Sequence, residues 1–106
     1  MRILFDQSTP LPLRSWLAAH EIETACERGW SEFSNGDLLA AAETANFDLF
    51  ITTDHNLRYQ QNLDRHRLVI LVLMVGNWPA LEHQAEAIAT AVETIQPGQY
   101  VEWSPP

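Results

Sequence analysis

The apolar run LVILVLMV, residues 68–75, constrains the fold more than any other stretch of the sequence. A strand with one solvent-exposed face alternates apolar and polar residues, whereas this run is apolar at every position. Strands of that kind belong to parallel sheets that are covered on both faces. The run is also too short to cross a lipid bilayer. It therefore predicts an interior strand of a sheet with helices on both sides.

The remaining segments alternate between strand-like and helix-like patterns. Further short strands are predicted at residues 2–6, 22–26, 48–52 and 99–103. Helices are predicted after Thr9, at 37–46, near 56–62, and from Pro79 through Ile95. Thr9 is expected to cap the first of these helices and Pro10 to open it. The alternation predicts a three-layer α/β/α sandwich around a mostly parallel sheet of about five strands, formed as one domain over residues 1–106.

The charge of the chain limits its partners. There are 14 acidic residues, six arginines and no lysine, which gives a formal net charge of −8. Proteins that bind nucleic acid over their whole surface are basic, so that class is excluded. The segment 55–67 differs, because Arg58, Arg65 and Arg67 stand there against the single acid Asp64. A phosphate-bearing partner is expected to approach at this segment or at bound cations.

The single cysteine, Cys26, excludes an internal disulfide and a zinc ribbon. An unpaired cysteine fits a reducing compartment. The sequence shows no apolar segment of secretory or membrane-spanning length. These observations predict a cytoplasmic protein without a membrane partner.

Acidic side chains directly follow two of the predicted strands. Asp6 comes after the first strand, and the stretch FITTDHNL places Asp54 after the third. Ligands of parallel sheets gather beyond the carboxyl ends of the strands, so the two carboxylates share one edge if these strands are neighbours. Asp37 lies in the first turn of the helix that leads to the third strand. Its position relative to that edge stays open, because the path of the preceding loop does not follow from the sequence.

Such a cluster of carboxylates has a characteristic chemistry. Carboxylates a few ångströms apart repel one another unless a cation compensates them. Oxygen ligands suit Mg²⁺ or Mn²⁺, which hold a phosphate and lower the pKa of a bound water. The cluster therefore predicts phosphodiester hydrolysis by metal-activated water. Asn56 is expected to add a neutral ligand or to orient the water, and the hydroxyl of Thr52 or Thr53 is an alternative.

Each of these residues also has a structural interpretation. The sequence SNGD, which ends at Asp37, matches a capping box and explains that acid by helix-start energetics alone. Asp54 or Thr53 can cap a following helix, and Asp6 can end a strand. Trp30 and Phe33 are predicted to pack in the core, with a lid or a partner contact as the alternative. A phosphoacceptor receiver domain is excluded, since such domains require a lysine that this chain lacks.

The order of the motifs resembles that of compact bacterial PIN-like domains, which are related to ribonuclease toxins of the VapC type. The resemblance rests on ILFDQSTP at the start, SNGDLLAAAETANFDLFITTDHNL in the centre, and LVILVLMV before an amphipathic helix. It implies a PIN-like α/β/α fold, a Mg²⁺ or Mn²⁺ site, ribonuclease activity on RNA, and a small antitoxin protein as partner. Carried over residue by residue, it makes Asp6, Asp37 and Asp54 the metal ligands.

Two departures from that family pattern concern the site itself. The chain reads Asp6-Gln7-Ser8 where these domains commonly read Asp-Glu-Asn, and Asp54-His55-Asn56 where they often read Asp-x-Asp. Neutral side chains thus replace two possible anionic ligands, which is expected to weaken cation binding. The alternative function is a PIN-like module that no longer cleaves and acts by binding a protein partner.

The predicted site has three parts. Asp6, Asp37 and Asp54 are expected to hold the metal, and Asn56 to assist them in catalysis. The candidate substrate contacts are Arg58, Arg65, Arg67 and His55. Whether the chain forms a homodimer stays open.

Overall fold

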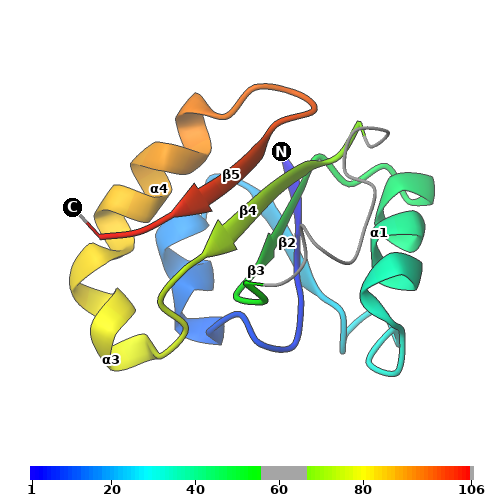
Figure 1. Ribbon diagram of the computed structural model, residues 1–106, viewed down its shortest axis with the longest axis horizontal. Helices are drawn as coiled ribbons and strands as arrows, with labels where there is room; N and C mark the ends of the chain where they lie inside the picture. Colours follow the sequence, from blue (N-terminus) through cyan, green and yellow to red (C-terminus); the bar gives the residue numbers. More distant parts are fainter. Residues whose placement is uncertain (56–66, 106) are drawn as a thin grey trace.

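The computed structural model describes residues 1–55 and 67–105, which contain a five-stranded sheet in the order β2-β1-β3-β4-β5 (Figure 1). All four strand pairings are parallel. The predicted α/β class and the mostly parallel sheet are therefore confirmed. The strands are β1 (Arg2–Phe5), β2 (Glu21–Thr24), β3 (Leu49–Thr52), β4 (Val69–Leu73) and β5 (Tyr100–Trp103).

The interior strands are the most apolar ones, as the sequence pattern predicts. β3 and β4 are buried at every position, whereas the edge strands β2 and β5 are partly exposed. The run LVILVLMV therefore forms an interior strand, and its buried part is slightly shorter than the run itself. Alternate residues of β1 point to opposite faces of the sheet: Ile3 and Phe5 join one apolar cluster, and Leu4 joins the other.

The two apolar clusters are completed by helices on the two faces of the sheet (Figure 1). On one face lie the 3-10 helix η1 (Leu11–Leu17), α3 (Trp78–Leu81) and α4 (Ala85–Thr94), which contribute Leu13, Ile88 and other buried side chains. On the other face, α1 (Asn35–Thr44) contributes Leu38, Leu39 and Ala42. Within residues 1–55 and 67–105, no helix is long and apolar enough to cross a membrane.

Helix α1 begins at the predicted capping box. The hydroxyl of Ser34 accepts a hydrogen bond from the backbone N–H of Asp37 at 3.2 Å. The helix starts two residues earlier than predicted, because Asn35 and Gly36 already adopt helical geometry after the cap. This early start brings Asn35 into the first turn.

Two helix predictions require correction. Thr9 does not cap the first helix: the 3-10 helix η1 follows Pro10 without a side-chain cap, and the Thr9 hydroxyl binds elsewhere. The helix predicted from Pro79 is divided into α3, a 3-10 turn (Glu82–Gln84) and α4, and its first turn is capped by Asn77. The apolar spacing survives the break, since Leu81 and Ala85 are both buried. The helix predicted near residues 56–62 lies outside the described residues.

Candidate active site

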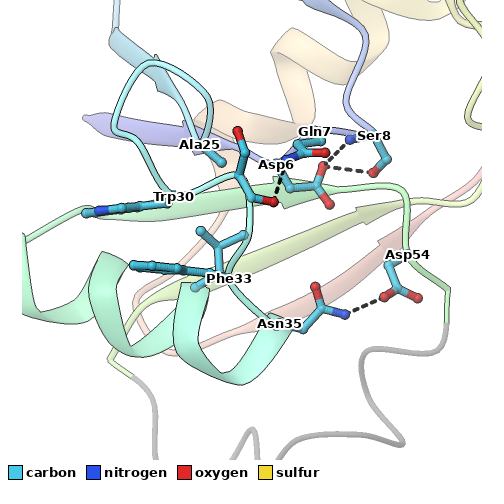
Figure 2. Close-up of a pocket in the computed structure, with 10 residues that line it drawn as sticks. Asp6, Gln7, Ser8, Ala25, Trp30, Phe33, Asn35 and Asp54 are labelled. Carbon is cyan, nitrogen blue, oxygen red and sulfur yellow. Dashed lines mark hydrogen bonds between the residues drawn. The ribbon is translucent and has the colours of Figure 1, made fainter.

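Asp6 and Asp54 both lie at the carboxyl edge of the sheet and line one cavity of about 250 Å³ (Figure 2). Asp6 follows β1 and Asp54 follows β3 shortly after its last residue, and these two strands are paired. The backbone N–H of Asp6 extends the pairing by donating to the carbonyl of Ile51 at 3.2 Å. The topology of the sheet therefore brings together two acids that are far apart in the sequence.

The carboxylate of Asp6 organises the turn that follows it. Its Oδ1 lies 3.1 Å from the backbone nitrogens of Ser8 and Thr9, and 2.8 and 2.7 Å from their hydroxyl oxygens. Its Oδ2 accepts a hydrogen bond from the hydroxyl of Thr52. The sequence DQST thus favours a tight turn, because the acidic acceptor Asp6 is followed by small polar residues that donate hydrogen bonds to it.

Thr52 connects the two aspartates. Its side chain is 1% exposed, and its hydroxyl donates to Asp6 while accepting from the backbone N–H of Asp54 at 3.0 Å. Both hydrogen-bonding capacities are used inside the protein, and the position of Asp54 is thereby tied to that of Asp6. Thr52 therefore positions the carboxylates of Asp6 and Asp54. This role differs from that of a metal ligand, which its place in the sequence had suggested.

Asn35 is the residue of this site that the sequence pattern did not reveal. Its side-chain Nδ2 donates to Oδ2 of Asp54, and it lines the same cavity (Figure 2). An asparagine at a helix start has many structural uses, so its approach to Asp54 becomes visible only once α1 is placed beside the sheet edge.

Asp37, the third predicted ligand, is exposed and is not among the residues that line the cavity. Its backbone N–H serves the Ser34 cap. Within the part of the chain that the structure describes, no group of three histidine, cysteine or acidic side chains is close enough to hold a metal. The described carboxylates of the cavity are Asp6 and Asp54.

The predicted substrate contacts are only partly described. His55 is exposed and directly follows Asp54. Arg67 precedes β4 and so lies at the opposite, amino edge of the sheet, where its guanidinium is 3.7 Å from Glu43. The structure therefore does not bring Arg67 to the carboxylates of Asp6 and Asp54. Asn56, Arg58 and Arg65 lie outside the described residues.

The loop between β2 and α1 forms the other wall of the cavity. Its rings of Trp30 and Phe33 are stacked, with centroids 5.9 Å apart and planes inclined by 12°. The predicted core packing is confirmed for Trp30, which contacts the buried Phe47, and is wrong for Phe33, which is 42% exposed. The side-chain Nε2 of Gln7 donates to the carbonyl of Ser31 at 2.6 Å and joins this loop to the end of β1.

Gln7 stands where the PIN-like domains that the sequence resembles commonly have a glutamate, and its amide makes a contact that a glutamate could not make. A glutamate carboxylate has no proton to donate to a carbonyl at neutral pH. Glutamate at this position would therefore lose the hydrogen bond to Ser31 and place two acceptors against each other. The amide supports the loop instead of adding a negative charge beside Asp6.

A reciprocal pair of hydrogen bonds fixes the beginning of the same loop. The carboxylate of Glu27 accepts from the backbone N–H of Thr24 at 2.9 Å, and the Thr24 hydroxyl accepts from the backbone N–H of Glu27 at 3.0 Å. The hydrogen bond from Thr24, together with the nearby guanidinium of Arg14, lowers the pKa of Glu27 below its usual value. The chain thus forms a capping box at a turn.

The oxygen atoms of the cavity lining that could serve as metal ligands fit a hard divalent cation. The described lining contains two carboxylates, amide groups of Asn35 and Gln7, and no histidine or cysteine. Mg²⁺ is commonly bound by one or two carboxylates together with waters and substrate phosphate. A soft or imidazole-preferring metal would find no suitable ligand among these residues.

No family model, curated protein or solved structure was found to match the chain.

Proposed function

We propose that the protein is a PIN-like ribonuclease that uses Mg²⁺ or Mn²⁺ to hydrolyse phosphodiester bonds. The observation that supports this function best is the meeting of Asp6 and Asp54 in one cavity at the carboxyl ends of neighbouring parallel strands. That edge is where ligands of parallel α/β sheets bind. The oxygen-rich lining of the cavity suits a magnesium-type cation that also contacts phosphate.

The bound cation would lower the pKa of a water and stabilise the leaving oxygen. The residues of the chain would hold and orient the cation for that reaction. Asp6 and Asp54 supply the negative charge that holds the cation, and Thr52 fixes their relative position. Asn35 orients the carboxylate of Asp54. The two acids repel a phosphate in the absence of metal, so substrate binding is expected to require the cation.

The role of Asn35 can be tested by replacing it with alanine. Loss of a hydrogen bond that orients a metal ligand lowers metal affinity or activity by about 10- to 100-fold. We expect Asn35→Ala to reduce both Mn²⁺ affinity and RNA cleavage within that range. Calorimetric titration and a gel assay on a single-stranded RNA would measure the two quantities.

Ser34→Ala is a matched control for that experiment. It alters the same helix start and is expected to cost about 1 kcal/mol of stability through loss of the cap. It leaves the hydrogen bond from Asn35 to Asp54 in place. If both variants lose activity equally, the effect comes from the helix start and not from the orientation of Asp54.

The proposal includes a cellular compartment, the cytoplasm, and a protein partner. A cytoplasmic ribonuclease needs an inhibitor while its activity is unwanted, and we propose a small antitoxin protein in that role. The net charge of −8 favours a basic inhibitor. Co-expression of such an inhibitor should restore growth to cells in which the ribonuclease is toxic, and the Asp54→Asn variant should be harmless without it.

A second candidate function is a module that binds a protein partner and does not cleave RNA. It is favoured by the use of the Asp6 carboxylate inside its own turn, where five donor atoms surround its two oxygens. The role of the Asp6 carboxylate in stabilising this turn is enough to explain its presence without a metal. Binding of Mn²⁺ separates the two functions, because only the ribonuclease needs the metal.

A further inference from the structure

The cavity beside the two aspartates has an aromatic wall that metal binding does not explain. Figure 2 shows the rings of Trp30 and Phe33 on one side of it and the carboxylates of Asp6 and Asp54 on the other. Leu38 and Ala25 add apolar surface. Phe33 is 42% exposed, although an aromatic ring gains stability when it is buried. The exposed part of the Phe33 ring is therefore accessible for stacking against a ligand.

The Trp30 ring of the aromatic wall is held in place before any ligand arrives. The guanidinium of Arg28 lies 4.7 Å from the centre of the Trp30 ring, and Phe47 meets the same ring edge-on at 6.2 Å. The backbone N–H of Trp30 donates to the carbonyl of Ala25 at 2.8 Å. A ligand that stacks on Trp30 meets a ring that is already positioned, so little freedom of that side chain is lost on binding.

The charge of the cavity restricts what that ligand can be. Its described lining contains two aspartates and no arginine, lysine or histidine, so without a bound cation a phosphate is disfavoured in its interior. A nucleobase is planar and uncharged, and it stacks on aromatic side chains without needing a cation. Unpaired RNA bases are the ones available for such stacking. The volume of about 250 Å³ is large enough for one base.

We propose that this cavity binds the base of one unpaired RNA nucleotide, stacked on the Trp30–Phe33 pair, next to the phosphate that is hydrolysed. This inference rests on the proposed ribonuclease function. The pair would place the nucleotide so that its phosphate lies at Asp6 and Asp54. Single-stranded RNA would accordingly be the substrate, and a fully paired duplex would be cut poorly because its bases are not free to enter.

The test uses adenosine and uridine, which carry a base and no phosphate. Each is titrated without metal into the ¹⁵N-labelled protein while the indole N–H signal of Trp30, assigned with Trp30→Phe, is followed. We expect a saturable shift of that signal. Phe33→Leu keeps the apolar bulk but removes the aromatic face, and it should weaken nucleoside affinity by between about fivefold and 100-fold. Phe33→Tyr should retain the affinity.

Trp16→Phe is the matched control, because Trp16 is exposed on η1, away from the cavity, and should not matter. Absence of a Trp30 shift with both nucleosides, or equal affinity in Phe33→Leu, overturns the base pocket. So does a shift produced by methylguanidinium alone, which would make the cavity a cation site.

The same titration separates this proposal from the ribonuclease proposal. Nucleoside binding that persists in a protein without RNA cleavage or Mn²⁺ binding overturns the ribonuclease and leaves the base pocket standing. Metal-dependent cleavage that is unchanged in Phe33→Leu overturns the base pocket alone.

Discussion

Asp54→Asn is expected to lower RNA cleavage by at least about 100-fold, because loss of a direct metal ligand should cost no less than loss of its supporting hydrogen bonds. The change keeps the size of the side chain and an oxygen to accept the hydrogen bond from Asn35. Stability should change little: a half-buried, isosteric substitution is expected to lower Tm by less than about 4 °C. Initial rates on single-stranded RNA and thermal unfolding of the same samples measure both effects.

Glu86→Gln controls for the lost charge. Glu86 is exposed at the start of α4, on the face of the sheet opposite α1, and its replacement changes the net charge by the same amount. It should cleave at the wild-type rate. Wild-type cleavage by Asp54→Asn would remove Asp54 from the catalytic site, whatever the control shows.

Asp6→Ala is expected to give the second large effect, and it acts on stability as well as on cleavage. Without the carboxylate, the hydroxyl of the buried residue Thr52 loses its acceptor, whereas the hydroxyl of Thr9 can still donate to the carbonyl of Ile51. A buried donor left unsatisfied costs about 1–3 kcal/mol, so a loss in that range is expected. Tm should fall by about 5 °C or more in a domain of this size. Thermal and urea unfolding measure this loss.

Asp6→Asn separates the two roles of that side chain. Its remaining oxygen can still accept the hydrogen bonds of the turn from Ser8 and Thr9, whereas the hydroxyl of Thr52 loses its acceptor, so stability should be partly restored relative to Asp6→Ala. Cleavage should stay low, because the negative charge at the metal site is missing. If Asp6→Asn is both stable and fully active, Asp6 has a structural role only, and the partner-binding function gains support.

The fold followed from sequence patterns because its determinants are local. The uninterrupted apolar run 68–75 had to be buried on both faces, and the alternation of strands and helices then led to a parallel sheet. The pairing of Asp6 with Asp54 depended only on whether two strands are neighbours. Residues just beyond the ends of paired parallel strands must share an edge.

The rest of the site depends on loops, whose paths no local pattern determines. Asn35 reaches Asp54 because α1 begins beside the sheet edge, and Gln7 reaches Ser31 because the loop after β2 folds back over β1. Asp37 was the more conspicuous residue in the sequence, since its charge fits a ligand as well as a cap. The structure gives the contact with Asp54 to its neutral neighbour Asn35 instead.

Local competition between donors and acceptors explains one of the helix corrections. Thr9 was a reasonable cap for the helix that follows Pro10, yet its hydroxyl lies 2.7 Å from both the Asp6 carboxylate and the carbonyl of Ile51. A charged acceptor forms the stronger hydrogen bond. The turn after β1 therefore uses the threonine to hold Asp6, and the helix begins without a side-chain cap.

Calorimetric titration of Mn²⁺ into wild type, Asp54→Asn and Glu86→Gln tests the central claim most directly, because the claim is that Asp6 and Asp54 together hold a divalent cation. The account predicts saturable binding by wild type and by Glu86→Gln, and loss of that binding in Asp54→Asn. Equal binding by Asp54→Asn, or no binding by wild type at millimolar Mn²⁺, would contradict it.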